Sequence, residues 1–248
     1  MIEIRGLVKS FSGQPVLAGV DLLISEGECL VIMGPSGTGK SVLLKHIVGL
    51  VDPDEGDVWV DGVAVSTATQ RAILEIRSKI SYVFQNSALF DSLSVRGNLL
   101  MGLPEGACAD PDTDCEELAR RALSHVNLGP DVLTLLPAEL SGGMQRRVGI
   151  ARAIIGERRY ILYDEPTTGL DPVNATRINE LIASVNREVE ATSVIVTHDV
   201  ASAFFLADRI VLLSDGIVQA EGTPDDLQKT ENPVVRAFLD ATPTAEAT

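Results

Sequence analysis

The chain has 248 residues, of which 45% are hydrophobic, and its 35 acidic against 20 basic residues give a formal net charge of −15. A chain of this size can bury a sizeable core, either as one large α/β domain or as one core with an inserted subdomain. The acidic balance argues against a nucleic-acid partner, which would require clustered Lys and Arg. Plain solubility is the simplest explanation of this acidity.

The sequence shows no charged start followed by an apolar block, so we expect no signal peptide. No apolar run approaches the ~18 residues that span a bilayer, so work at a membrane would need another chain to hold this one there. The three cysteines fit no zinc spacing. Cys29 lies in an apolar run and is expected in the core, whereas Cys108 and Cys115 flank an acidic stretch typical of a solvated loop. We therefore expect a reducing compartment.

The first 65 residues have the pattern of strands around one helix. Residues 1–31 alternate apolar and polar side chains, which predicts short antiparallel strands. Within them, residues 29–33 form a continuous apolar run, as in a strand buried on both faces. A glycine-rich turn follows, and apolar residues at helical spacing from 42 to 48 predict a helix. Residues 57–65 are predicted to form a hairpin, because Asp61-Gly62 is a favoured turn pair.

The remaining chain predicts a parallel sheet interrupted by a helical region. Residues 80–84 are typical of a strand, and from about 86 to 158 helical segments alternate with polar loops, which we interpret as an inserted helical subdomain. The strands and helices that follow alternate, which places helices on the faces of a parallel sheet. The later strands are 160–163, 193–197 and 209–213, with helices at about 173–190, at 200–207 and after Thr223. We expect residues 1–240 to form a single domain and 241–248 a flexible tail.

The segment from Gly34 to Ser41 reads GPSGTGKS and matches the pattern G-x-x-x-x-G-K-[ST] between a predicted strand and a predicted helix. Glycines let backbone N–H groups curl around phosphate oxygens, and the helix N-terminus adds partial positive charge. Lys40 would reach the β- and γ-phosphates, and the Ser41 hydroxyl would bind Mg²⁺. The residues expected to contact the nucleotide here are Gly34, Pro35, Ser36, Gly37, Thr38, Gly39, Lys40, Ser41 and Val42.

Two carboxylates, Asp164 and Glu165, end the apolar run Tyr-Ile-Leu-Tyr that begins at residue 160. In a phosphate-loop protein, an aspartate at this strand tip holds Mg²⁺, directly or through water. The adjacent glutamate would polarise the attacking water as a general base. Paired acids after a strand are often only a helix cap or a solvated turn, but the phosphate loop upstream favours the catalytic interpretation.

A second glycine-containing segment, Leu-Ser-Gly-Gly-Met-Gln at residues 140–145, precedes a helical run. Ser141 fits the N-cap position of that helix. The adjacent Gly142 and Gly143 would let the backbone approach an anion at the helix end. An ordinary capped helix is the alternative, and no spacing rule excludes it.

Taken together, these motifs resemble those of the ABC ATPase family. LSGGMQ resembles the family's signature sequence, and GPSGTGKS, Gln85, LYDEP, Gly-Leu-Asp171 and His198 lie in the family's order. The resemblance covers nearly the whole chain. It implies an α/β fold, a P-loop NTPase core with a parallel sheet, an antiparallel β subdomain and an inserted helical subdomain. It also implies ATP and Mg²⁺ as cofactors and ATP hydrolysis as the activity.

The same resemblance implies roles for four further residues. Phe11 occupies the place of the aromatic residue that stacks on adenine, where the family often has tyrosine, and a core phenylalanine is the alternative. Gln85 resembles the residue that senses Mg²⁺ and the attacking water. Asp171 resembles the residue that crosses the dimer interface, and His198 the histidine that contacts the γ-phosphate. The other two histidines are given no role.

The family also implies partners. Ser141 and Gly143 would act across a homodimer, closing on ATP held by the phosphate loop of the other copy, so that two copies build two composite sites. ATP would hold the dimer shut and hydrolysis would release it, which is a switch biased by its ligand. The switch would drive an integral membrane permease from the cytoplasmic face of the inner membrane, with this chain attached peripherally.

Three short stretches resemble the ATPases of Mla/Mce lipid-transport systems: YVFQNSALFDSLSVRGN at residues 82–98, LSGGMQRRV at 140–148, and NPVVRAFLD at 232–240. The resemblance implies transport of phospholipids or other hydrophobic molecules between membranes. The apolar residues 87–93 would line the groove that receives a permease helix, with Leu89 and Phe90 in it. Internal packing of the helical subdomain is the alternative.

Other phosphate-loop proteins fit less well. A GTPase should carry an N-K-x-D guanine reader, which is not found, and a small-molecule kinase would not need LSGGMQ. A soluble ABC ATPase of DNA repair or cluster assembly is the stronger rival, although repair types usually carry long coiled-coil insertions. A scaffold that does not hydrolyse ATP is disfavoured because Lys40, Asp164, Glu165 and His198 are all present. Cargo, transport direction and permease stay open.

Overall fold

The computed structural model of the protein describes residues 1–241. The predicted tail, 241–248, therefore lies outside the described residues apart from Ala241. The chain divides into two compact units. The first comprises residues 1–77 and the chain from residue 192 onward, and the second comprises residues 78–191.

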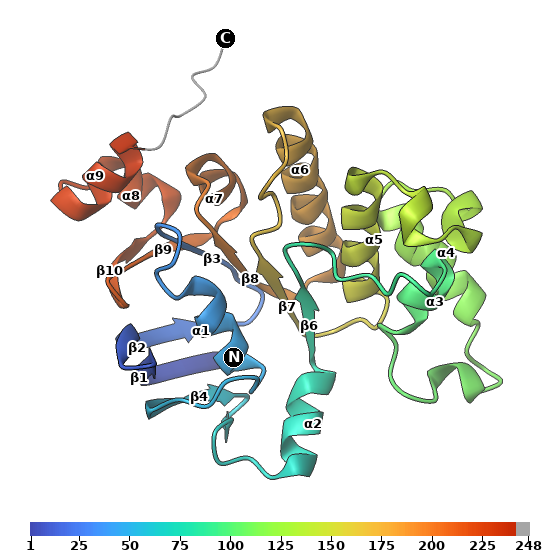
Figure 1. The fold of residues 1–248 in the computed structure, drawn as a ribbon, viewed down its shortest axis with the longest axis horizontal. Helices are drawn as coiled ribbons and strands as arrows, with labels where there is room; N and C mark the ends of the chain where they lie inside the picture. The colour runs from blue at the N-terminus through green and yellow to red at the C-terminus, as the bar shows by residue number, and fades with distance from the viewer. Residues whose placement is uncertain (242–248) are drawn as a thin grey trace. The chain divides into compact units, whose positions relative to one another are not determined.

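An antiparallel sheet forms one part of the first unit. Its strands are β1 (Ile2–Phe11), β2 (Gln14–Ile24), β4 (Glu55–Val60) and β5 (Val63–Ala64), in the order β2-β1-β4-β5. In Figure 1, β1, β2 and β4 run side by side at the blue end of the chain. The strands β1 and β2 have 10 and 11 residues, so the expected antiparallel pair is present but its strands are long. Alternate β1 residues are buried near its start, which explains the apolar–polar alternation of the sequence.

The predicted hairpin connects β4 and β5. Asp61 and Gly62 form its two-residue turn, with φ angles of 51° and 80°, and Val60 pairs with Val63 across it. Positive φ at both central residues is the geometry of a type I′ turn, which matches the right-handed twist of the flanking strands. The turn pair therefore acts as the sequence predicts.

The first unit also contains a row of mainly parallel strands. These are β3 (Cys29–Met33), β8 (Thr192–Thr197), β9 (Arg209–Ser214) and β10 (Ile217–Gly222), in the order β10-β9-β3-β8. The strand β3 runs parallel to both β8 and β9, whereas β10 returns antiparallel to β9. Every residue of β3 and β8 is buried, as the continuous apolar runs predict for strands covered on both faces.

Up to residue 241, the first unit contains five helices: α1 (Lys40–Ile47), α2 (Gln70–Ser78, which ends at the unit boundary), α7 (Val200–Leu206), α8 (Pro224–Lys229) and α9 (Pro233–Ala241). Helix α7 packs on β3 and β8. The cap at Thr223 forms as predicted, with Thr223 accepting from the N–H of Asp226 and the Asp226 carboxylate accepting in return. Helix α2 is not apparent in the sequence, because only one of its residues, Ile76, is buried.

The second unit contains two parallel strands and a group of helices. The strands are β6 (Ile80–Val83) and β7 (Tyr160–Asp164). The helices are α3 (Val95–Leu100), α4 (Cys115–His125), α5 (Gly142–Ile154) and α6 (Pro172–Val189), with short 3₁₀ turns at Ala107–Ala109, Pro130–Thr134 and Pro137–Glu139.

Helix α5 organises this unit. It packs against α3, α4, α6 and β6, and Figure 1 shows α3, α4 and α5 gathered together. The stretch 86–158 holds only helices, turns and loops, all of which the structure describes. No helix within residues 1–241 is both long and apolar enough to cross a bilayer.

Two of the three cysteines are paired. Cys108 and Cys115 form a disulfide with their Cα atoms 5.8 Å apart. Cys115 is buried as the first residue of α4, which Asp114 caps, whereas the acidic stretch between the two cysteines is almost entirely exposed, as predicted for a solvated loop. The prediction of a reducing compartment assumed unpaired cysteines, so this disulfide removes one of the arguments for it. Cys29 is not part of a disulfide and is buried, as predicted for a core residue.

Candidate nucleotide-binding site

The phosphate loop connects β3 to α1 in the first unit. A Cβ atom at Gly34 would lie 2.1 Å from the backbone oxygen of Leu213, so no larger residue fits there. Gly39 precedes α1 with a φ of 93°, in the left-handed region, and a Cβ there would meet the backbone oxygen of Val16 at 2.9 Å. These glycines allow the tight turn that leads the chain from a buried strand into a helix.

Lys40 is held against this loop. Only 5% of the residue is exposed, and its Nζ donates to the carbonyl oxygens of Gly34 at 2.8 Å and Pro35 at 2.9 Å. The Thr38 hydroxyl donates to the same Pro35 oxygen at 2.9 Å. A buried ammonium beside the N-terminus of α1 concentrates positive charge where phosphate oxygens would bind.

His198 lies at the same sheet edge as the phosphate loop. The strands β3 and β8 are parallel neighbours, with Met33 opposite Thr197, so the residues that follow them leave the sheet together. The Thr197 hydroxyl accepts from the N–H of Asp199 at 3.0 Å, and Asp199 caps α7. His198 is therefore fixed in a tight, exposed turn.

Phe11 ends β1 and is 44% exposed, with the Lys9 ammonium 5.5 Å from the centre of its ring. The alternative of a core phenylalanine is therefore wrong. An exposed aromatic face with a cation beside it can stack on a base, which keeps the adenine role open.

In the second unit, β6 and β7 bring a separate group of predicted residues to one edge. These strands are parallel, with Val83 opposite Tyr163, so Gln85, Asp164 and Glu165 lie where the two strands end. Gln85 is exposed in the turn after β6, and Asp164 is 9% exposed.

The two acidic residues have different surroundings. The Tyr82 hydroxyl donates to Asp164 Oδ2 at 2.7 Å, and burial, together with this carboxylate, raises the pKa of Tyr82. Glu165 has a left-handed backbone, with a φ of 50°, and its Oε2 accepts from the Thr168 hydroxyl at 2.9 Å. Tyr82 thus orients Asp164, and Thr168 orients Glu165.

The signature segment begins α5, as the sequence predicts. Ser141 is the N-cap, and its Oγ accepts from the N–H of Met144 at 3.3 Å. A Cβ added at Gly142 or Gly143 would meet nothing within 4 Å, so the backbone at this helix end is open to a ligand. Open N–H groups at a helix N-terminus suit an anion.

Asp171 caps α6. Its side chain accepts from the N–H of Asn174 at 3.1 Å and from the Asn174 amide at 2.5 Å. These hydrogen bonds lower the pKa of Asp171, because they favour its charged form. Asp171 is exposed at the N-terminal end of α6.

Comparison with known proteins decides the family. The family model described as ABC transporter matches residues 17–168. The chain belongs to the ABC transporter family. It binds ATP and is an ATPase, and its α/β fold with a parallel and an antiparallel sheet is that of the ABC cassettes.

Two relatives and one solved structure show how close the similarity is. The probable ribonucleotide transport ATP-binding protein mkl of Mycobacterium leprae is 37% identical over 96% of this chain and 68% of that protein. The chloroplastic protein TRIGALACTOSYLDIACYLGLYCEROL 3 of Arabidopsis thaliana is 38% identical over 96% of this chain and 73% of that protein. The dimeric ATP-binding cassette MJ0796, solved after hydrolysis with ADP and phosphate, is 34% identical, with a TM-score of 0.79, over 90% of this chain and 99% of that one. This ABC cassette thus spans about two thirds to three quarters of the two relatives.

Within each unit of the ABC cassette, the structure groups the predicted residues. The phosphate loop and His198 share an edge of the first unit, and Gln85 shares an edge of the second with the two acids. Sequence reasoning missed Tyr82 and Thr168, which hold those acids. Tyr82 gives a weak signal, as a polar residue at the centre of a short apolar strand, whereas Thr168 gives none.

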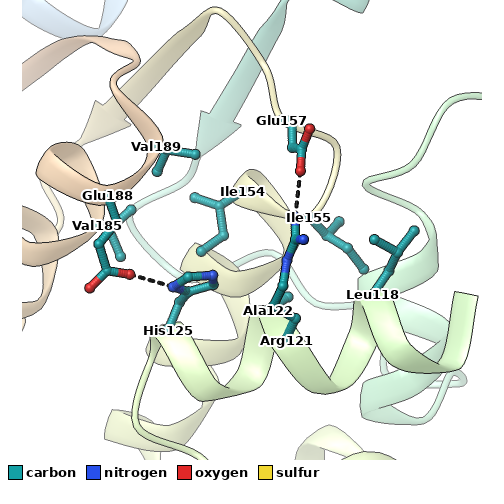
Figure 2. A pocket seen from close by; sticks show the side chains of 10 residues that line it. All are labelled: Leu118, Arg121, Ala122, His125, Ile154, Ile155, Glu157, Val185, Glu188 and Val189. Atoms are coloured by element: carbon teal, nitrogen blue, oxygen red, sulfur yellow. Dashed lines mark hydrogen bonds and ion pairs between the residues drawn. The ribbon is translucent and has the colours of Figure 1, made fainter.

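The second unit also contains a cavity of about 390 Å³ between α4 and the ends of α5 and α6 (Figure 2). Aliphatic side chains such as Ile154 line it, Arg121 pairs with Glu157 at its edge, and His125 Nδ1 hydrogen-bonds to Glu188. None of the predicted nucleotide-binding residues lines this cavity. It is therefore separate from the ATPase chemistry.

Proposed function

We propose that this chain is the ATP-hydrolysing subunit of an ABC transporter, and that two copies close on ATP and drive a membrane permease. The proposal depends on three features that occur together in one chain. These are a phosphate loop whose turn requires glycine, the buried Asp164 at a strand end followed by Glu165, and a signature helix with Ser141 as its N-cap and an accessible N-terminus. The dimeric cassette bound to ADP and phosphate supports the closure of two copies. A permease would hold the chain at the cytoplasmic face of the inner membrane.

The phosphate end of ATP is bound by residues of the phosphate loop. Lys40 moves its ammonium from the carbonyls of Gly34 and Pro35 toward the β- and γ-phosphates, whose charge exceeds that of the carbonyl dipoles. The side chains of Ser41, Gln85 and Asp164 offer hydroxyl, amide and carboxylate oxygens, which are the ligands that Mg²⁺ prefers. When bound, Mg²⁺ neutralises charge that develops on the β- and γ-oxygens.

The remaining residues serve the attacking water. The Glu165 carboxylate accepts its proton, and the Thr168 hydroxyl keeps that carboxylate in place. Gln85 and His198 orient the water and the γ-phosphate. Ser141 and Gly143 of one copy close on ATP bound by the other, and Asp171 reaches across the same dimer. Phe11 stacks on adenine.

Replacing Glu165 with Gln tests the ATPase assignment. Glu165→Gln keeps the size of the side chain and the bond from Thr168 but removes the base. We expect phosphate release to fall by at least about 10²-fold, the contribution of a general base, while ATP traps the protein as a dimer in size-exclusion chromatography. Glu180→Gln, on the exposed face of α6, is the matched control and should behave as wild type. Unchanged hydrolysis in Glu165→Gln would refute the assigned base.

A second cavity supports the permease interaction. It measures about 500 Å³ and is lined in part by Phe84, Phe90, Met101 and Arg152. Phe84, Phe90 and Met101 are 41%, 50% and 59% exposed, which is an unusual cluster of large apolar side chains on a surface. Phe90, one of the two residues predicted to form the permease groove, lines this cavity, whereas Leu89 is not among its lining residues. We propose that an apolar helix of the permease docks here.

The change Phe90→Asp places a charge in this cavity. We expect recovery of the permease with the purified cassette to fall at least about tenfold, because a buried unpaired carboxylate is strongly disfavoured. ATP binding should stay within about twofold of wild type. Phe205→Asp, at a similarly exposed site on α7, controls for added charge. A parallel loss of ATP binding in Phe90→Asp would show that the side chain supports the fold instead.

For the cargo, we propose phospholipids or other hydrophobic molecules moved between membranes. The three stretches that resemble Mla/Mce ATPases support this, and one relative is named for the lipid trigalactosyldiacylglycerol, although another is named for ribonucleotide transport. Isolation of the native complex from membranes, followed by lipid analysis, tests the cargo. Enriched phospholipid supports the proposal, and ribonucleotide without lipid refutes it. Recovery of a cassette without any permease would favour a soluble ABC ATPase.

A further inference from the structure

Two arginines on one face of α5 donate hydrogen bonds to the backbone of the turn that contains Gln85. Arg146 Nη2 donates to the Gln85 carbonyl at 3.0 Å, and two turns later Arg152 donates to the carbonyls of Ser87 and Ala88, each at 2.8 Å. Residues 146, 149 and 152 follow one another at intervals of three, so they lie along one side of the helix. A Cβ at Gly149 would lie 3.3 Å from the Ser87 Cβ, which shows how closely helix and turn approach.

The turn needs this support. Ser87 and Ala88 have φ angles of 60° and 43°, in the left-handed region that residues with a Cβ rarely adopt. Two consecutive residues of this kind are retained only where the surroundings impose them. The shape of the turn, and with it the direction of Gln85, therefore depends on α5.

Arg146 also reaches a second loop. The same Nη2 donates to the Thr168 carbonyl at 3.1 Å, while the Thr168 hydroxyl donates to Glu165 Oε2 at 2.9 Å. One guanidinium thus spans the Gln85 turn and the loop that holds Glu165. Arg146 belongs to α5, whose N-cap is Ser141, so the signature segment and both loops are connected through one helix.

Arg146 is partly buried, and one nitrogen of its guanidinium is fully enclosed. Its Nη1 is buried and has no hydrogen-bond partner within residues 1–241, and burial lowers the pKa of this guanidinium. An unpaired buried donor costs stability. In return, the guanidinium makes the hydrogen bonds to the Gln85 and Thr168 carbonyls, which an apolar side chain of similar length could not make.

We propose that Arg146 is a positioning residue for hydrolysis, which fixes Gln85 relative to Glu165 through its hydrogen bonds to the Gln85 and Thr168 carbonyls. This inference rests on the proposed function. Without the guanidinium, ATP still binds to the phosphate loop, but the two residues that act on the attacking water lose their common support. Catalysis is sensitive to such displacements, since errors near 1 Å lower rates by about two orders of magnitude.

Steady-state ATPase assays on the whole chain test this. Arg146→Met should lower kcat by roughly 10- to 100-fold and leave KM for ATP within about twofold. Arg146→Lys, which keeps a charged donor, should restore part of the loss. The control is Arg147→Met, because the neighbouring arginine donates instead to the Asn127 carbonyl. It should stay within about twofold of wild type. A kcat for Arg146→Met equal to that of Arg147→Met overturns the proposal.

A double-mutant cycle separates positioning from folding. If Arg146 acts through Thr168, then Arg146→Lys combined with Thr168→Val should lower kcat by less than the product of the single effects. If the two single substitutions lower kcat independently, so that their effects multiply, the proposal is overturned. It is also overturned if Arg146→Lys lowers kcat, ATP affinity and resistance to urea together. Arg146→Lys alone decides the question if Arg146→Met does not fold. The proposed function fails by a different result, namely wild-type protein that does not hydrolyse ATP.

Discussion

The hydrogen bond from Tyr82 to Asp164 gives a sharp prediction about Mg²⁺ binding. The bond is 2.7 Å long, and Asp164 is 9% exposed, so water cannot readily replace the hydroxyl. Because burial and Asp164 both raise the pKa of Tyr82, the phenol stays protonated and donates at physiological pH. The change Tyr82→Phe removes this donor and leaves the ring in place.

The size of the effect follows from the charge of the acceptor. Hydrogen bonds to charged groups contribute about 1.5–3 kcal/mol, and a factor of ten corresponds to about 1.4 kcal/mol. Loss of a partner that orients a metal ligand typically lowers metal affinity by about 10- to 100-fold. We therefore expect the Mg²⁺ concentration for half-maximal ATPase activity to rise about tenfold or more.

The assay is a Mg²⁺ titration of phosphate release at saturating ATP, with urea unfolding of each variant. Tyr163→Phe is the matched control, because it removes a tyrosine hydroxyl from the neighbouring strand, one that donates to Asn186 Oδ1 at 3.2 Å. Unchanged Mg²⁺ dependence in Tyr82→Phe would refute the reasoning. So would a lower requirement for Mg²⁺, since that would mean that the phenol competes with the metal for the carboxylate.

Two further predictions concern stability. His46 donates from Nδ1 to the Val42 carbonyl at 2.8 Å, and burial lowers the pKa of this histidine in the folded protein. As pH falls below about 6.5, the unfolded chain therefore takes up a proton before the folded protein does. The free energy of unfolding should decrease there by up to ~1.4 kcal/mol per pH unit. In urea titrations from pH 8 to 5.5, His46→Asn, which keeps a donor but cannot titrate, should lose this part of the slope, and an identical slope would contradict the burial argument. The disulfide closes a short loop, with a sequence separation of 7, so Cys108→Ser should lower the free energy of unfolding by up to about 2.5 kcal/mol. A reductant should destabilise wild type alone, and equal stability with and without it would show that Cys108 and Cys115 are not bonded in solution.

The parts of the fold that were predictable from the sequence are those with local causes. The buried run at residues 29–33 forms β3 because parallel strands need apolar side chains on both faces. The turn at Asp61-Gly62 forms because these two residues tolerate positive φ. Gly34 and Gly39 of the phosphate loop stand where neighbouring backbone leaves no room for a side chain, so the glycine pattern of the sequence reflects a local requirement.

The parts that were not predictable depend on contacts between distant residues. Tyr82 and Asp164 are 82 positions apart, and nothing in the strand pattern pairs them. Arg146 looks like any charged helix residue until the carbonyls of Gln85 and Thr168 are placed beside it. The expected reducing compartment favoured unpaired cysteines at 108 and 115, but the structure pairs them, because pairing depends on how the loop returns to α4. The catalytic roles of the individual residues stay predictions.

The left-handed backbone of Glu165 has a consequence for protein engineering. Glycine adopts this conformation without strain, whereas a glutamate there costs on the order of 1 kcal/mol. Glu165→Gly would thus relieve the main chain while removing the proposed base. Selection of this cassette for heat resistance alone would therefore tend to enrich stable variants that no longer hydrolyse ATP. A screen for stabilised variants has to measure thermal stability and ATPase activity together.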